Sequence, residues 1–100
     1  MARNRPRRTA GDELTALANI GPAIREDLRL LGIDTVVALA DQEADALYQR
    51  LNQLTGRRHD PCVWDVFAAA IHQARTGEGL PWWHWTPERK RRQTTGGFRL

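Results

Sequence analysis

Gly21 and Pro22 stand where two predicted helices meet, and this junction is suited to bind an anion. Proline is common at the first position of a helix, because the N–H group that it lacks would have no helical acceptor there. The next N–H groups, those of Ala23 and Ile24, also lack a partner inside the helix, and the helix dipole adds partial positive charge beside them. Such a terminus can hold a phosphate group. We therefore predict that the segment 19–24 contacts an anion, with a nucleic-acid phosphate as one candidate.

The chain must turn tightly at Asn19-Ile20-Gly21 to bring these two helices together. Gly21 can adopt a positive φ without steric cost, and Asn19 is one of the few other residues that tolerate the left-handed region. We include all three residues in the predicted nucleic-acid contact. The alternative is that glycine and proline only set the geometry of a helical turn.

A second anion site is predicted at the basic segment Arg57-Arg58-His59. This segment precedes Asp60-Pro61, which is a strong signal for the start of a helix. Three basic side chains beside a helix N-terminus could bind a phosphate. The alternative is a solvated loop in which Asp60 itself caps the helix.

Trp82, Trp83 and Trp85 fall within four residues, which is rare on a free surface. Their spacing is not helical, and we expect two rings to cover the open end of the bundle while the third stays partly exposed. Two alternatives remain open, namely a contact site for a protein partner and a platform for stacking nucleic-acid bases.

His59 and Cys62 are spaced so that metal binding or catalysis must be considered. Zinc needs four ligands, so His72 and His84 would have to converge with them, and the sequence has no C-x-x-C pair. The helix N-terminus could lower the pKa of Cys62, and His59 could then act as a base toward a thiol nucleophile. The sequence shows no carboxylate pair, phosphate-binding glycine loop or Ser-His-Asp pattern. We expect a small buried cysteine, no metal site, no catalytic residue and a protein that is not an enzyme.

The elements that position these residues are predicted from apolar periodicity and capping signals. We expect an all-α fold, a compact five-helix bundle with a short extra C-terminal helix at Thr86-Pro87-Glu88. The expected starts are Asp12, Pro22, Asp34 or Thr35, Asp41, and Asp60-Pro61; the expected ends are Ala18, Gly32, Gly56 and Gly77. The expected buried faces are Leu14, Leu17 and Ile20; Ile24, Leu28 and Leu31; Val36, Val37 and Leu39; Leu47, Leu51 and Leu54; and Val63, Phe67, Ile71 and Ala74, with Trp64 beside them.

Charge is segregated along the 100 residues. Residues 1–10 and residues 88–100 each carry a net charge of +4, so the overall charge of +3 leaves −5 between them. We expect a disordered basic arm at 1–10, a helical domain at 11–87 and a disordered basic tail at 88–100. The single cysteine excludes an internal disulfide, and no apolar run is long enough for a membrane span. We expect a cytoplasmic protein that contacts no membrane.

The turn at Asn19-Ile20-Gly21 resembles a helix-hairpin-helix module, whose hairpin amides typically hold a DNA backbone phosphate without reading sequence. The usual hairpin reads Gly-hydrophobic-Gly, and a basic residue often follows its proline, where this chain has Ala23. The second half repeats the plan of the first. Together the halves resemble the doubled helix-hairpin-helix fold, whose units pack about a pseudo-twofold axis.

The resemblance also implies a cation site. In similar hairpins, backbone carbonyls hold a potassium or sodium ion where DNA is bound. The corresponding carbonyls here belong to Thr15, Leu17 and Ile20.

Four motifs make the resemblance more specific: Ile20-Gly21-Pro22-Ala23; Asp27-Leu28-Arg29-Leu30-Leu31-Gly32-Ile33; Arg58-His59-Asp60-Pro61-Cys62-Val63 with Asp65-Val66-Phe67; and Trp82-Trp83-His84-Trp85-Thr86. They are similar to the pathogenicity-locus family of small bacterial helix-hairpin-helix proteins, some of which are labelled mitomycin-resistance proteins. The resemblance covers about residues 12–90. It implies a helical fold, and a link to DNA repair or damage that rests on that fold and on those labels.

Two functional hypotheses follow. In the first, the chain is a noncatalytic module, expected to be a monomer, that binds the nucleic-acid backbone without sequence specificity. In the second, it is a protein-interaction adaptor that uses its helix faces and its tryptophans, while its acidic body disfavours DNA. Arg25 and Arg29, one turn apart on the second helix, could serve either hypothesis.

Overall fold

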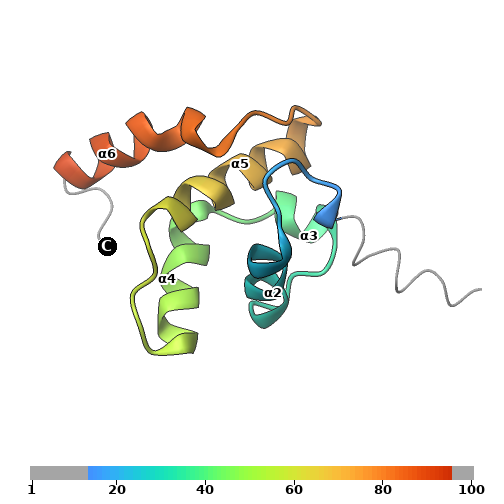
Figure 1. Ribbon diagram of the computed structural model, residues 1–100, viewed down its shortest axis with the longest axis horizontal. Coiled ribbons are helices and arrows are strands. Elements are labelled where there is room, and N and C mark those ends of the chain that lie inside the picture. Colours follow the sequence, from blue (N-terminus) through green and yellow to red (C-terminus); the bar gives the residue numbers. More distant parts are fainter. Residues whose placement is uncertain (1–13, 96–100) are drawn as a thin grey trace, which may run out of the picture.

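The computed structural model describes residues 14–95, and helix α5 runs through the middle of this part of the molecule (Figure 1). The described residues contain helices and no strand, so the predicted all-α fold is confirmed. None of these helices is long and apolar enough to span a membrane. The elements are α2 (Pro22–Leu30), α3 (Val36–Ala40), α4 (Ala44–Thr55), α5 (Cys62–Thr76), the short 3-10 helix η1 (Trp82–Trp85) and α6 (Thr86–Thr95).

The core forms around α5, which packs against α3, α4, η1 and α6. Phe67 is fully buried and Ile71 nearly so, while Val63 and Ala74 are partly buried at the edges of the same stripe. The predicted apolar face of this helix is therefore confirmed, with Trp64 buried beside it. The other elements add buried residues to the same core: Leu14, Ile20, Leu28, Leu31, Ile33, Leu39, Leu47, Tyr48 and Leu51.

The predicted helix ends at glycine are confirmed. Gly32, Gly56 and Gly77 follow α2, α4 and α5 with φ values of 82°, 71° and 84°, in the left-handed region that glycine adopts without a steric penalty. At the start of α3, Thr35 is the cap rather than Asp34, because its hydroxyl accepts the Ala38 N–H at 3.0 Å.

Two predictions about α4 need correction, its first residue and its buried face. Asp41 is not its N-cap: α4 begins at Ala44 with Glu43 before it, and Asp41 instead ends α3. Leu54 was expected on the buried face, yet it is 58% exposed while Leu51 is fully buried. The last turn of α4 points away from α5, as Figure 1 shows, so the core does not reach Leu54.

The first predicted helix is shorter than expected. Among its described residues, Leu14 and Thr15 are helical and the chain then turns. The Leu17 N–H bonds back to the Leu14 carbonyl at 3.1 Å, and the Ala18 N–H leaves the helical pattern to donate to Gln73 Oε1 of α5 at 2.8 Å. This tertiary contact ends the helix before Ala18. Residues 11–13 of the predicted helix lie outside the described part.

The predicted basic tail also needs correction. Its residues 88–95 form most of α6, a helix of ten residues. The reason is a buried ion pair, because Arg89 of α6 contacts the fully buried carboxylate of Asp65 in α5. The predicted arm at 1–10 and the residues 96–100 lie outside the described part of the chain. The rest of the proposed division of the chain stays a prediction.

Candidate nucleic-acid interface

The N-terminus of α2 is open. Gly21 precedes it in an extended conformation, with φ −94° and ψ −174°, and gives no side-chain cap. The first helical hydrogen bond runs from the Arg25 N–H to the Gly21 carbonyl at 2.9 Å, so the N–H groups of Ala23 and Ile24 lie ahead of the helical ladder. Gly21 and Ala23 are exposed, and Ile24 is partly buried. The residues expected to donate backbone N–H groups to an anion are thus at the surface.

The predicted backbone of this turn is wrong. Gly21 does not adopt a positive φ, and no residue other than glycine does so in the described part of the chain. Extended backbone at the position before a helix is the usual N-cap geometry, which any residue can adopt. The chain therefore turns through two overlapping short turns, at Leu14–Leu17 and Leu17–Ile20, rather than through a left-handed residue.

The N-terminus of α2 has neither a side-chain cap nor an acidic residue in its first turn, a combination that none of the helices α3 to α6 shows. Thr35 caps α3, and the other three helices carry a carboxylate at or beside their first turn, from Asp45, Asp60 and Glu88 respectively. The first turn of α2 has no acidic residue. An anion would therefore meet no competing carboxylate within that turn.

Asn19 has a structural role that its sequence position does not reveal. Its side-chain amide donates to the Leu80 carbonyl at 2.8 Å and accepts the Trp82 N–H at 3.0 Å. Ile20 is buried in the core. Both side chains thus fix the turn in place from inside, and the surface of the predicted contact comes from Gly21 and Ala23.

Arg25 and Arg29 of α2 are both next to carboxylates. Arg25 is paired with Asp34 at 3.2 Å. Arg29 is paired with Glu26, an exposed contact that lowers the pKa of the glutamate. The Arg29–Glu26 pair is exposed on both sides and contributes little to stability, so a phosphate can compete with Glu26 at small cost. The Arg25 side chain is only 18% exposed in its pair with Asp34.

The predicted basic segment divides into two exposed residues and one buried residue. Arg57 and Arg58 are exposed, and neither forms an ion pair with any residue in the described range. His59 is buried: its Nδ1 and its backbone N–H lie 2.8 and 2.9 Å from Asn52 Oδ1, and its carbonyl accepts a hydrogen bond from the Tyr48 hydroxyl. His59 holds the turn together, and the two arginines face solvent.

Asp60 caps α5, as the alternative interpretation of this segment predicted. Its Oδ1 accepts the Cys62 N–H at 2.8 Å, and hydrogen bonding to this N–H lowers the pKa of Asp60. The N-terminus of α5 is thus occupied by a carboxylate of the chain itself. Arg57 and Arg58 must act through their side chains and not through this helix terminus.

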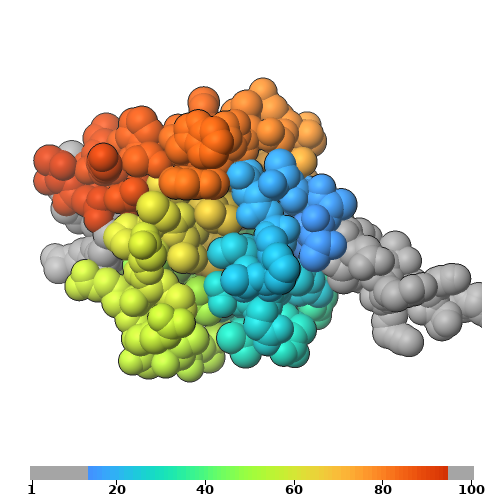
Figure 2. All heavy atoms as spheres, viewed as in Figure 1, coloured from blue at the N-terminus to red at the C-terminus, as the bar shows by residue number. Residues whose placement is uncertain are grey.

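The arginine turn lies near Asp27, in the second half of α2. Burial raises the pKa of Asp27 in α2, and the nearby charges of His59 and Arg57 act in the opposite direction. Such an effect on Asp27 requires the turn to lie close to α2. Figure 2 shows α2 and the segment after α4 on the face turned toward the viewer. We refer to Gly21, Ala23, Ile24, Arg57 and Arg58 as the open face.

The tryptophans form η1, with Trp82 and Trp85 partly buried and Trp83 61% exposed. Trp85 packs against the core. The Trp82 and Trp83 rings meet edge to face, with centroids 5.6 Å apart. Trp83 is the exposed ring that the packing interpretation expects and Trp85 is a covering ring, whereas Trp82 is partly buried beside Trp83.

The surroundings of Cys62 do not favour the thiol hypothesis. Burial and the neighbouring Asp60 raise the pKa of this thiol, whereas the hypothesis requires a lowered value. His59 is engaged with Asn52 on its Nδ1 side. Within residues 14–95, no three His, Cys, Asp or Glu side chains are placed to hold a metal ion together.

The sequence analysis missed the most deeply buried ion pair. Asp65 Oδ1 lies 2.9 Å from Arg89 Nε, and Asp65 Oδ2 accepts the Thr86 hydroxyl at 2.7 Å. The signal for this site was an acidic residue between Trp64 and Val66 in an otherwise apolar run. A carboxylate in such a run needs a charged partner from another element.

Comparisons with known proteins agree with the family resemblance. The family model described as Pathogenicity locus (Cdd1) matches residues 7–91. The mitomycin resistance protein McrB of Streptomyces lavendulae is 40% identical over 81 residues, covering 81% of this chain and 77% of that protein. No solved structure matches the chain. The chain belongs to the Pathogenicity locus family.

Proposed function

We propose that this member of the Pathogenicity locus family is a noncatalytic module that binds the nucleic-acid backbone without sequence specificity. The observation that supports the proposal most strongly is the N-terminus of α2, which has neither a side-chain cap nor an acidic residue in its first turn. Arg57 and Arg58 are exposed, and the segment that carries them is turned toward the same side as α2 in Figure 2. A role in DNA repair or the damage response, and mitomycin resistance of the kind named in the Streptomyces relative, are part of this proposal.

In the proposed contact, one phosphate binds at the N–H groups of Ala23 and Ile24, and the arginines of the next turn reach neighbouring phosphates. Backbone amides and guanidinium groups contact phosphate oxygens and carry no base information. Arg25 and Arg29 can also contact the nucleic acid if phosphate groups replace their carboxylate partners. Binding is then insensitive to sequence and falls steeply with salt.

The helix-hairpin-helix resemblance adds a potassium or sodium ion at the carbonyls of Thr15, Leu17 and Ile20. The fit is partial, since the Leu17 carbonyl already accepts the Ile20 N–H at 3.3 Å. The proposed contact does not depend on this ion. We also propose that the protein works as a cytoplasmic monomer.

The test compares two double variants, each of which loses two positive charges. Arg57→Ala with Arg58→Ala removes them from the open face, and the matched control, Lys90→Ala with Arg91→Ala, removes two exposed charges from α6. Binding to a fluorescent duplex is measured at several salt concentrations. We expect the slope of log K against log salt to fall by about 2 for the first pair and to change less for the control. Equal slopes for the two double variants would remove the arginine turn from the interface.

A second candidate function is supported by Trp83. An indole that is 61% exposed beside another tryptophan is a common anchor in protein interfaces. In this case the protein is an interaction adaptor, and Trp83→Ala loses a partner in a pull-down while its unfolding transition stays unchanged. Loss of folding in that variant would assign Trp83 to packing.

A further inference from the structure

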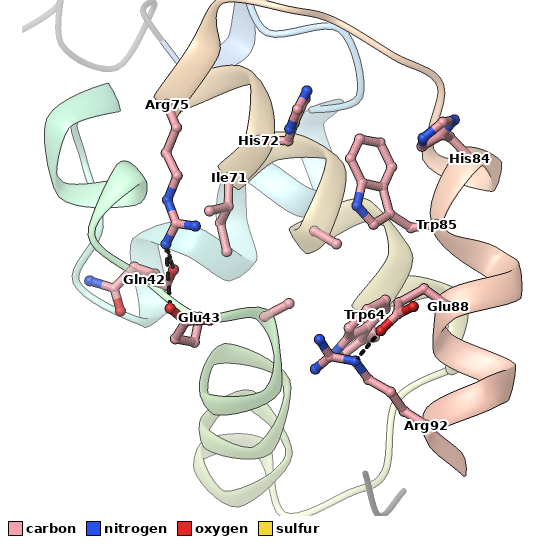
Figure 3. A pocket seen from close by; sticks show the side chains of 12 residues that line it. Gln42, Glu43, Trp64, Ile71, His72, Arg75, His84, Trp85, Glu88 and Arg92 are labelled. Atoms are coloured by element: carbon pink, nitrogen blue, oxygen red, sulfur yellow. Dashed lines mark hydrogen bonds and ion pairs between the residues drawn. The ribbon is translucent and has the colours of Figure 1, made fainter. Parts of the chain in front are cut away.

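A groove of about 460 Å³ lies between α5, α6 and the start of α4, with η1 at its edge (Figure 3). No residue of the open face lines it. Its volume is within the range of small-molecule sites, which are usually lined by aromatic and apolar groups with a few polar ones. The tryptophans of two elements, Trp64 of α5 and Trp85 of η1, contribute to its walls.

The charged groups of this groove already compensate one another. The Arg75 guanidinium donates to the Gln42 carbonyl at 2.8 Å and lies 3.5 Å from the Glu43 carboxylate. Arg92 lies 2.8 Å from Glu88 on the opposite wall. With both guanidinium groups paired, the groove offers neither a net positive nor a net negative centre, which favours an uncharged ligand.

Trp85 provides a hydrogen-bond donor at the groove. Its ring is held on two sides by imidazoles, with centroids 5.2 Å from His72 and 4.7 Å from His84. The indole is half-buried, and Figure 3 shows its nitrogen turned toward the groove. This N–H donates no hydrogen bond to any residue that the structure describes.

The floor of the groove is small and apolar. Ala44, Ala68 and Ile71 line it between the two charged walls. Small side chains leave room for a ring beside Trp85, whereas a large residue at any of these positions would fill the space. The Trp64 indole differs from Trp85, because its N–H already donates to Asp45 at 2.7 Å and Arg92 lies over its ring.

We propose that this groove binds a flat, uncharged heteroaromatic molecule that lies over the apolar floor and accepts a hydrogen bond from the Trp85 indole N–H. The ring of the ligand packs on Ala44, Ala68 and Ile71, and its edge faces the indole. The edge acceptor satisfies a donor that has no partner among residues 14–95. The paired charges of the walls disfavour ionic ligands of the same shape.

The test uses caffeine as the probe, since it is flat, uncharged and rich in acceptors. The four tryptophans give separate indole N–H signals in an NMR titration. We expect the Trp85 signal to shift in a saturable manner, while the exposed Trp83 signal moves little. Two reference compounds are naphthalene-2-sulfonate, which is flat but charged, and cyclohexanone, which is an acceptor but not aromatic. Both are expected to bind at least about tenfold more weakly.

Trp85 packs against the core, so substituting it could unfold the protein. The second test therefore fills the groove and leaves Trp85 unchanged. Ala44→Leu places a larger side chain in the groove, and Ala46→Leu makes the same change at an exposed position on the same helix. We expect caffeine to bind about tenfold more weakly to the first and with unchanged affinity to the second. Equal affinity for the two variants, a shift centred on Trp83, equal binding of the reference compounds, or no saturable shift would each overturn the proposal. None of these results bears on the open face.

Discussion

Asp65 is a carboxylate without exposed surface, placed inside the apolar stripe of α5. Arg89, Thr86 and the carboxylate form one compact group that joins α6 to the core. A buried charge is tolerated only when it is paired and hydrogen-bonded, and removal of one partner leaves the other uncompensated.

We therefore predict that Asp65→Asn destabilises the protein strongly. The substitution leaves the Arg89 guanidinium buried without its counter-charge, and we expect a loss of about 3 kcal/mol in the free energy of unfolding. Urea denaturation followed by tryptophan fluorescence measures it. Glu26→Gln, which breaks the exposed pair with Arg29, serves as the control and should change little. Equal stability of Asp65→Asn and the wild type would show that the ion pair does not hold α6.

For single residues, sequence rules predicted those roles that depend on contacts with residues nearby in the chain. Asp60 was identified as a cap, and Thr35 as one of two candidates with Asp34, because a cap bonds to an N–H two or three residues away. The partners of Asn19, His59 and Arg89 could not be predicted in this way. Asn19 bonds to the segment that begins at Leu80, 61 residues further along the chain.

The open N-terminus of α2 is the element that carries the proposed function. Gly21 has extended backbone, and a Cβ atom added there would meet no atom within 4 Å. A capping side chain can therefore be introduced at this position without strain. Such a cap would occupy the place of the proposed phosphate.

We predict that Gly21→Asp stabilises the fold slightly and weakens nucleic-acid binding. The new carboxylate caps α2, a gain of about 0.3 kcal/mol over glycine. It also repels a phosphate at the same terminus by about 1 kcal/mol, which corresponds to about fivefold weaker binding. Gly21→Ser is the matched control, because it can cap the helix without adding charge. If both variants bind duplex DNA as the wild type does, no phosphate sits at α2.

The elements themselves were predictable where apolar periodicity and glycine signals agree, as in α2, α4 and α5. The full extent of α6 was not, since its sequence Thr86–Thr95 has little apolar periodicity and its order depends on Asp65. The same applies to the end of the first helix, where Gln73 of α5 takes the Ala18 N–H. Tertiary hydrogen bonds decided both cases.

At the scale of the whole molecule, the sequence places a net charge of −5 between its two basic ends. The acidic side chains next to the open face, such as Glu26 and Asp60, are engaged with Arg29 and with the Cys62 N–H. The proposed interface is thus local: it relies on one helix terminus and two arginines, not on a basic surface. The all-α class and the family followed from sequence motifs, whereas the position of the groove depends on long-range packing.

The most direct test of the nucleic-acid proposal is an amide-resolved NMR titration of the whole chain with a short duplex DNA, at low and at physiological salt. We predict that the signals of Gly21, Ala23 and Ile24, together with those of Arg57 and Arg58, shift at both salt concentrations. Shifts confined to the basic ends of the chain and lost at physiological salt would indicate nonspecific charge attraction. That result, or no shift at all, would contradict the proposed function.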